Sequence, residues 1–139
     1  MRNLKRFTEA QRQDFDAALS EIQQGQKHSH WMWYIFPQIR GLGFSSMSVH
    51  YGIQSLEEAE AFLNDPYLGG NLRTISQALL ELDTDDPRRV FGSPDDMKLL
   101  SSMTLFEKAE GAGGVFTQVI EKYYKGRRDR RTLEILDKE

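Results

Sequence analysis

The sequence predicts a mainly α-helical protein with about six or seven helices and little or no strand. Three observations support this prediction. Apolar residues recur at helical spacing through most of the chain, capping residues stand before these segments, and glycine or proline interrupts them. A chain of 139 residues, 39% of them hydrophobic, is long enough to bury one core, and no internal repeat divides it. We therefore expect residues 1–139 to form a single compact domain.

The first helix is predicted over residues 4–22, where apolar side chains fall on one face. Asn3 is the expected N-cap, and Gly25 is expected just beyond the C-terminus. The aromatic segment 31–36 allows a short strand, the one place where we consider strand, because periodicity cannot assign so few buried residues. Residues 45–51 are expected to form one or two helical turns.

Capping residues predict the next two helices. Ser55 and Glu58 form a capping box, in which the serine hydroxyl accepts a hydrogen bond from the N3 amide while the glutamate reaches back. The Asp-Pro pair at 65–66 supplies an N-cap and an N1 proline for the following helix. Apolar residues at alternating spacings of four and three give that helix a continuous stripe over residues 68–82.

The second half of the chain shows the same alternation of caps and breaks. A short buried element at 90–92 precedes Ser-Pro-Asp-Asp at 93–96, which we interpret as the cap, N1 proline and early carboxylates of a helix ending near Ala109. This helix is apolar all round and is expected to lie centrally. Glycines then separate it from a helix at 115–123, and Asp129 is expected to cap a last short helix.

Composition excludes several classes of function. The formal net charge of −3 argues against a general nucleic-acid binder, and the basic residues near the C-terminus alternate with acidic ones as solvated charge does. The absence of cysteine excludes disulfides, thiolate metal sites and a cysteine nucleophile, and agrees with a reducing cytoplasm. No run approaches the roughly 18 apolar residues that span a bilayer. We expect a soluble, cytoplasmic, bacterial-type protein with no membrane contact.

Residues 28–37 form the first candidate site, because they contain both tryptophans and two of the three histidines. Trp31 and Trp33 would stack a planar, nucleotide-like ligand beside His30, or they would serve as core anchors, which is the commoner role. His28 and His30 would share a face in an extended chain and so suit a metal. No third ligand has a supporting spacing, so no metal site is expected.

The loop at residues 40–43 is the second candidate. Arg40 offers a guanidinium beside Gly41 and Gly43, whose backbone amides an anion can approach closely. The pattern is neither a dinucleotide-binding G-x-G-x-x-G fingerprint nor a P-loop. A tight turn that needs positive φ at its glycines is the alternative.

The start of the central helix is the third candidate. Asp95 and Asp96 are candidate general bases, and Lys98 would hold an anionic ligand. The alternative is that the carboxylates only favour a helix N-terminus and that small hydroxyl residues allow close helix packing. A serine hydrolase with a G-x-S-x-G elbow is disfavoured because that motif is absent. The hydroxyl residues of this helix that join the candidate site are Ser101, Ser102 and Thr104.

Several of these motifs together resemble one family. They are His-Trp-Met-Trp-Tyr-Ile-Phe-Pro-Gln at 30–38, Gly-Leu-Gly at 41–43, Asp-Asp-Met-Lys-Leu at 95–99 and Ser-Ser-Met-Thr-Leu-Phe at 101–106. The chain resembles the bacterial family known as domain of unknown function eighteen-ten, over nearly its whole length. The resemblance implies a single, mainly helical domain with no established activity. Some members carry the label calpastatin, which describes a long disordered inhibitor and does not fit this composition.

A second, more distant resemblance concerns helical layout alone. The predicted order of helices is similar to that of a family associated with NAD and ADP-ribose metabolism, some of whose members cleave N-glycosidic bonds. The motifs of those glycosidases are not recognisable here, so no catalytic residue follows from the similarity.

Two classes of function remain. In the first, the protein binds, and in one version hydrolyses, a small anionic nucleotide-like or ADP-ribose-like metabolite; tryptophans stack, Arg40 and Lys98 hold charge, and an aspartate activates water. Arg40→Ala should then abolish binding. In the second, the motifs are structural, and the protein is a non-enzymatic interaction module with an unidentified protein partner. The two differ in whether the aromatic segment and residues 95–104 line one open cavity. No cofactor is predicted in either.

Overall fold

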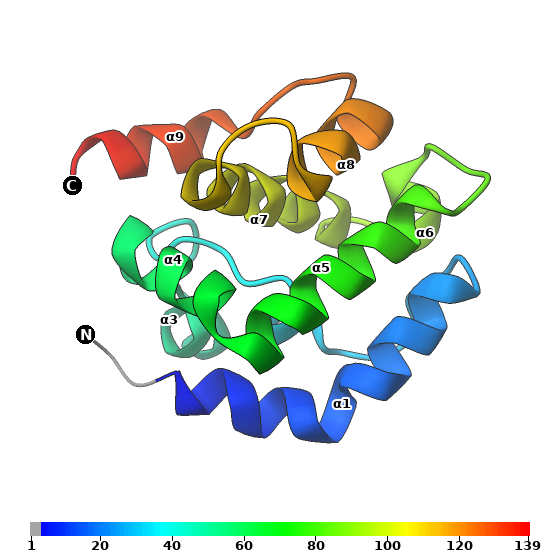
Figure 1. Ribbon diagram of the computed structural model, residues 1–139, viewed down its shortest axis with the longest axis horizontal. Coiled ribbons are helices and arrows are strands. Elements are labelled where there is room, and N and C mark those ends of the chain that lie inside the picture. Colours follow the sequence, from blue (N-terminus) through cyan, green and yellow to red (C-terminus); the bar gives the residue numbers. More distant parts are fainter. Residues whose placement is uncertain (1–3) are drawn as a thin grey trace.

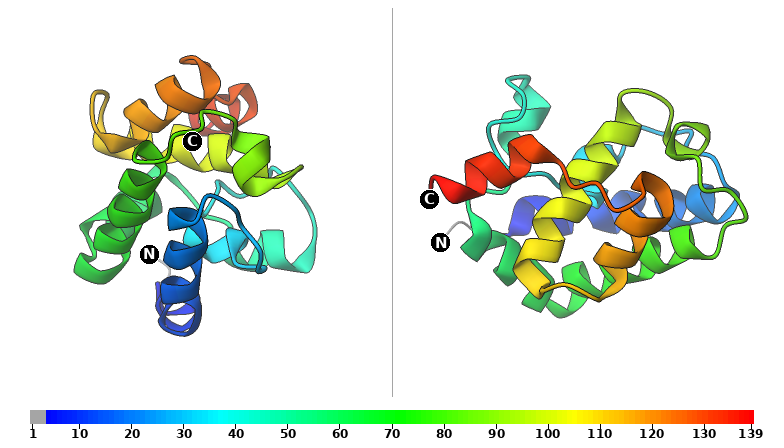
Figure 2. Two further views of the ribbon diagram at one scale, coloured as in Figure 1. Left: turned by 90° about the vertical axis from the view of Figure 1, so that its right-hand side faces the viewer. Right: turned by 90° about the horizontal axis from the view of Figure 1, so that it is seen from above.

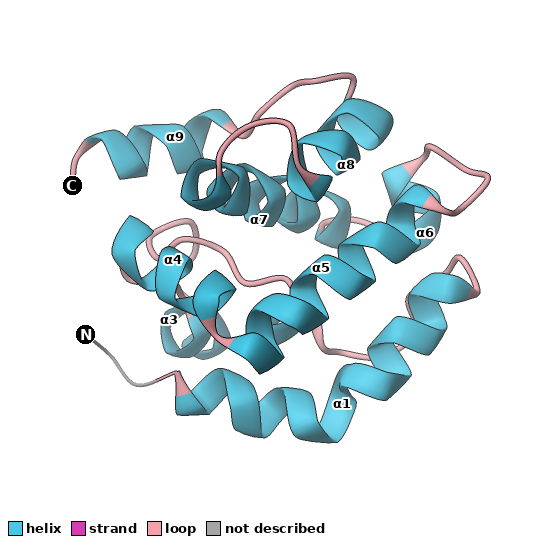
Figure 3. Ribbon diagram, in the orientation of Figure 1, coloured by secondary structure: helices cyan, strands magenta, loops and turns pink. Residues whose placement is uncertain are grey.

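Nine helices and their connecting loops make up the part of the chain that the structure, a computed structural model, describes: residues 4–139 (Figures 1 and 3). Six of these helices have at least seven residues, and no strand occurs within that range. The predicted mainly α fold is therefore confirmed. In chain order the helices are α1 Lys5–Gln23, α2 Met32–Ile35, α3 Ser46–Tyr51, α4 Leu56–Asn64, α5 Pro66–Leu80, α6 Pro87–Phe91, α7 Asp95–Glu110, α8 Val115–Tyr124 and α9 Arg130–Asp137.

Helix α1 ends as predicted. Gly25 has φ +85°, a conformation that favours glycine, and its amide donates to the carbonyl of Ile22 at 2.8 Å. The predicted N-cap Asn3 lies outside the described residues. The capping position of α1 is Leu4, which makes no side-chain capping bond.

The aromatic segment forms a helical turn, so the short strand that its composition allowed does not form there. Met32–Ile35 is α2, and the segment continues into the core with Phe36 fully buried. The backbone that does pair lies further on, where an isolated parallel bridge joins Ile39 and Ile53. That bridge closes the base of the loop that contains α3.

Side-chain caps begin α4, α5 and α9 at the predicted residues. Ser55, Asp65 and Asp129 each accept a hydrogen bond from the amide three residues further on. One detail of the capping box differs. The Glu58 carboxylate accepts from the amide of Gln54 at 2.9 Å, one residue before the predicted donor.

Helix α7 begins one residue later than its sequence suggests. Pro94 takes the capping position and makes no side-chain bond, so Ser93 is not the cap and the proline is not at N1. Asp95 and Asp96 lie in the first turn as predicted, where the positive end of the helix dipole favours them. The rest of α7 is the predicted central helix: it packs against α4, α6, α8 and α9, and residues 99–106 are all buried (Figures 1 and 2).

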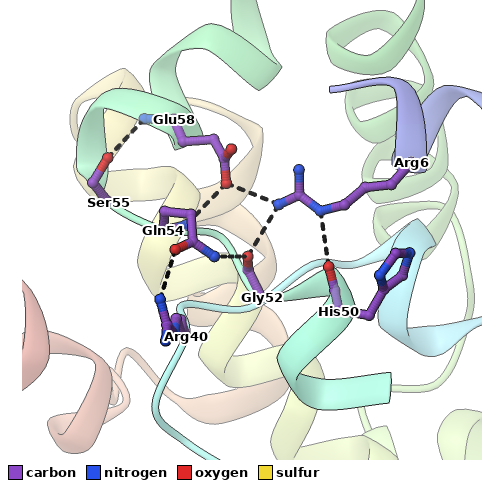
Figure 4. Close-up of polar contacts among 7 residues, drawn as sticks. All are labelled: Arg6, Arg40, His50, Gly52, Gln54, Ser55 and Glu58. Atoms are coloured by element: carbon purple, nitrogen blue, oxygen red, sulfur yellow. Dashed lines mark hydrogen bonds and ion pairs between the residues drawn. The ribbon is translucent and has the colours of Figure 1, made fainter. Parts of the chain in front are cut away.

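A buried ion pair ties the first helix to the region around α3 and α4 (Figure 4). Arg6 Nη2 lies 2.9 Å from Glu58 Oε1, and the two side chains are only 6% and 2% exposed. The same guanidinium donates to the carbonyls of His50 at 2.9 Å and Gly52 at 3.1 Å. One arginine therefore holds α1, the end of α3 and α4 together.

Helix α3 lies at the edge of the helical body (Figure 2). None of its residues is buried. Phe44, just before it, is 88% exposed, and Met47 and Val49 also face solvent. Among the described helices, none combines the length and apolar character needed to cross a membrane.

Candidate functional site

A cavity of about 240 Å³, which we call the Trp33 cavity, lies where four parts of the chain meet. Its wall comes from α2 and the loop after it, from α3 and Gly52, from the first turns of α7, and from the N-terminus of α9. The aromatic segment and the start of α7 therefore line the same open cavity. Apart from the aromatic residues Trp33 and Tyr51, the side chains with polar groups that line it are Gln38, Ser48, Lys98, Ser101, Asp129 and Arg131.

Trp33 and Lys98 form one wall of the cavity. Lys98 Nζ lies 3.9 Å from the centroid of the Trp33 ring, which places the ammonium over the negative face of the indole. Both side chains are only partly exposed. These two residues were predicted as ligand-binding residues from separate motifs, and the fold brings them into contact.

Lys98 also belongs to a row of alternating charges formed with Asp95 and Lys27. Asp95 Oδ1 lies 3.3 Å from Lys98 Nζ, and Asp95 Oδ2 lies 3.0 Å from Lys27 Nζ. Lys27 in turn lies 5.1 Å from the centroid of the Trp31 ring. Each tryptophan thus faces one lysine, and one aspartate bridges the two lysines.

Hydroxyl groups of α7 fix the N-terminus of α9 at the floor of the cavity. Asp129 Oδ2 accepts hydrogen bonds from Ser101 Oγ at 2.8 Å and from Thr132 Oγ1 at 2.5 Å. The Asp129 amide donates to Thr104 Oγ1 at 3.0 Å. Ser101 lines the cavity, whereas Thr104 is fully buried and acts by holding Asp129 in place.

Trp31 does not line the cavity. Its side chain is 1% exposed and packs in the core, and its indole N–H donates to Glu21 Oε1 at 2.9 Å. The same carboxylate accepts from the backbone amides of His28 and Ser29 and from the Ser29 hydroxyl. Glu21 therefore organises the turn that leads from α1 into the aromatic segment.

Replacing Glu21 with glutamine should make stability less dependent on pH in acid. Partial burial raises the pKa of this carboxyl, but hydrogen bonds from Ser29, His28 and Trp31 outweigh it and lower the pKa from 4.5 to about 2. A lowered pKa in the folded state gives stability that is complete above pH 4.5 and is lost as the pH falls towards 2. We expect Glu21→Gln to cost about 1–2 kcal/mol at pH 7, after allowance for solvent screening.

Urea unfolding at several pH values measures this effect. The difference between wild type and Glu21→Gln should shrink between pH 4.5 and 2, the two pKa values that bound the window. The matched control is Glu9→Gln, in the exposed pair between Lys5 and Glu9, which should change stability by about 0.3–0.5 kcal/mol. A difference that stays constant across this pH range would contradict the assignment.

Three other predicted residues lie away from the cavity lining. Arg40 is exposed, and its Nη1 donates to Gln54 Oε1 at 2.8 Å (Figure 4). Gly41 has φ +105°, a conformation that favours glycine. It therefore allows the tight turn, which was the alternative interpretation of this loop. His30 is exposed, and its carbonyl accepts a hydrogen bond from the Tyr34 hydroxyl at 3.3 Å. Gly43, in contrast, does line the cavity.

Two predicted residues of α7 point into the protein. The Asp96 side chain is buried, and its Oδ1 has no hydrogen-bond partner among the described residues. Tyr124 donates to the Asp96 carbonyl at 2.5 Å; burial, with the nearby Asp96 charge, raises the pKa of that tyrosine. Ser102 is fully buried, and no described group bonds its hydroxyl. Neither residue lines the cavity.

Sequence reasoning missed several lining residues. Asp129 was identified only as a helix cap, and Arg131 only as part of the basic stretch. Gln38 was recognised only as the last residue of the family motif at 30–38, and Ser48 and Tyr51 only as part of the helical turns predicted at 45–51. Within residues 4–139, no group of three or more histidine, aspartate or glutamate side chains is arranged to hold a metal ion.

The fold and this site together define an all-helical domain with a small half-open cavity lined by an indole and two cationic side chains. The chain belongs to the protein family of unknown function DUF1810, which it matches over residues 1–136. A solved structure with the same fold is that of the conserved hypothetical protein Rv1873 from Mycobacterium tuberculosis, with 45% sequence identity, a TM-score of 0.94 and 96% of each chain covered. Comparison with curated proteins gave no match.

Proposed function

We propose that the Trp33 cavity binds a small, planar, anionic ligand of the mononucleotide type. The observation that carries this proposal is the contact between the Trp33 ring and the Lys98 ammonium on one wall of an open cavity that Arg131 also lines. The indole offers a face for a base, and the two cations offer charge for a phosphate. Gln38 and Ser48 add hydrogen-bonding groups that can orient the ligand.

The size of the cavity narrows the class of ligand. Pockets that enclose drug-sized ligands usually measure about 300–1,000 Å³. A cavity of about 240 Å³ lies just below that range. This volume favours a nucleoside monophosphate or a smaller anion over ADP-ribose, which carries a second sugar phosphate.

The proposal is one of binding and assigns no reaction. Both carboxylate oxygens of Asp95 are paired with lysines, and the Asp96 carboxyl is buried away from the cavity lining. A general base must reach the proton that it abstracts, directly or through one water. The two aspartates named from the sequence as catalytic candidates therefore enter the proposal as structural groups.

Substitutions at the cavity wall should weaken ligand binding, and substitution of Arg40 should not. We expect Lys98→Met to reduce the affinity for adenosine monophosphate at least tenfold, because a charge-assisted contact is lost. Trp33→Leu should reduce it about fivefold to a hundredfold through lost stacking. Arg40→Ala should leave it unchanged, because this guanidinium bonds Gln54 outside the cavity lining.

Isothermal titration calorimetry measures all four proteins, with circular dichroism to show that each variant is folded. Loss of binding in Arg40→Ala with full binding in Lys98→Met would move the site to the glycine loop. If the wild-type protein binds no nucleotide, the result favours the alternative that the protein is an interaction module. The exposed apolar side chains of Phe44, Met47 and Val49 would then be the first surface to test.

A further inference from the structure

The Lys98 ammonium already has two partners in the ligand-free protein. It lies over the Trp33 ring at 3.9 Å and is paired with Asp95 at 3.3 Å. A base that stacks on this face of Trp33 must take the place of the ammonium. Stacking there therefore requires Lys98 to move from the ring and from Asp95.

We propose that Asp95 is a positioning residue that holds Lys98 in competition with the ligand, so that the cavity selects a dianionic phosphate monoester. This inference rests on the proposed function. A phosphate monoester carries close to two negative charges above pH 6 and three acceptor oxygens, so it outcompetes a single carboxylate for the ammonium. A neutral nucleoside offers Lys98 no compensating charge, and a phosphodiester offers only one.

The pairing of Asp95 makes this exchange favourable. Its second oxygen lies 3.0 Å from Lys27, whose side chain is only 8% exposed. When Lys98 moves to a ligand, Asp95 keeps this second lysine and is not left as an unpaired charge. A carboxylate held by one lysine alone would lose its only partner, at a greater cost.

The other charges around Lys98 define where the phosphate would lie. Arg131 lines the cavity and attracts the phosphate. Asp129 also lines it and repels the phosphate, although its Oδ2 is already bonded by Ser101 and Thr132. We therefore place the phosphate between Lys98 and Arg131. No histidine is among the described residues that line the cavity, so the titration expected near pH 6 belongs to the ligand.

Asp95→Asn gives the decisive test, because competition predicts tighter binding. Calorimetry should show adenosine monophosphate binding about threefold to tenfold more tightly to this variant than to wild type, since a partly exposed ion pair no longer opposes it. The matched control is Glu110→Gln, which removes one negative charge from the other end of α7, where Glu110 pairs with Arg73. It should change the affinity less than twofold, because exposed charges at that separation are screened.

The wild-type protein supplies an independent measurement that does not depend on how Asp95→Asn folds. Its affinity for adenosine monophosphate should rise as the pH passes through about 6, where the phosphate gains its second charge. Adenosine and the 3′,5′-cyclic monophosphate, whose charges do not change near this pH, should bind at least tenfold more weakly and show no such rise. The cyclic ester thus separates titration of the ligand from titration of the protein.

The possible failures are distinguishable. If wild type binds none of the three ligands, the proposed function is overturned and this inference with it. If adenosine monophosphate binds but Asp95→Asn is weaker than wild type, Asp95 supports the site rather than competing for Lys98. Adenosine binding as tightly as its monophosphate would overturn the selection of a phosphate monoester while the cavity remained a ligand site.

Discussion

Replacing Glu58 with glutamine should lower the free energy of unfolding by about 3–5 kcal/mol, because it removes the buried carboxylate that forms an ion pair with the Arg6 guanidinium. The pair lies almost wholly inside the protein, with Nη2 and Oε1 2.9 Å apart. The same carboxylate accepts the Gln54 amide, so the substitution also weakens the bend before α4. Urea unfolding followed by circular dichroism measures the loss.

The exposed pair of Arg73 and Glu110 is the control for this prediction. Its atoms are also 2.9 Å apart, but both side chains are partly exposed. Glu110→Gln should therefore cost at most about 1 kcal/mol. Equal losses at the two positions would show that burial does not decide the contribution of the Arg6–Glu58 pair.

Gly69→Ala should destabilise the protein by about 3 kcal/mol or more, the upper part of the range for overpacking. A Cβ at this position would lie 2.0 Å from the carbonyl oxygen of Leu63 and 2.8 Å from its carbonyl carbon. Both atoms belong to the backbone of α4, which cannot move aside as a flexible side chain can. The helices α4 and α5 pack against each other here and would have to separate.

The neighbouring glycine provides a control within the same helix. A Cβ on Gly70 would meet no atom within 4 Å, and the residue is exposed. Gly70→Ala should therefore stabilise the protein by about 0.5–1 kcal/mol, because alanine loses less backbone entropy on folding. Thermal unfolding of the two variants should shift the midpoint in opposite directions. A shift of Gly69→Ala to higher temperature would contradict the close packing of α4 and α5.

Local signals explain why most of the fold could be predicted from the sequence. A capping residue acts on an amide three residues away, so Ser55, Asp65 and Asp129 could be recognised without knowledge of any distant part of the chain. Periodicity likewise reports which face of one helix is buried. The one ambiguous segment, α2, has four residues, which is too short for either signal.

The candidate site depended on distant contacts and could be predicted only in part. In an extended segment, Trp31 and Trp33 would have pointed to the same side, and both were assigned to the ligand. Trp31 instead caps α2 with non-helical φ −122° and ψ 4°, and its ring enters the core, while Trp33 lies in the helical turn and lines the cavity. The Asp129 carboxylate accepts a hydrogen bond from Ser101, which lies 28 residues earlier in the sequence, and no local sequence pattern indicates this contact.

The unequal placement of the two indoles has a practical consequence. Because these are the only tryptophans in the sequence, ultraviolet emission of the unlabelled protein comes from one enclosed and one accessible ring. A water-borne quencher such as iodide should reach only the accessible one. Arrival of a small molecule beside it, or departure of the neighbouring ammonium, should change the emission, so the protein carries its own optical reporter of occupancy.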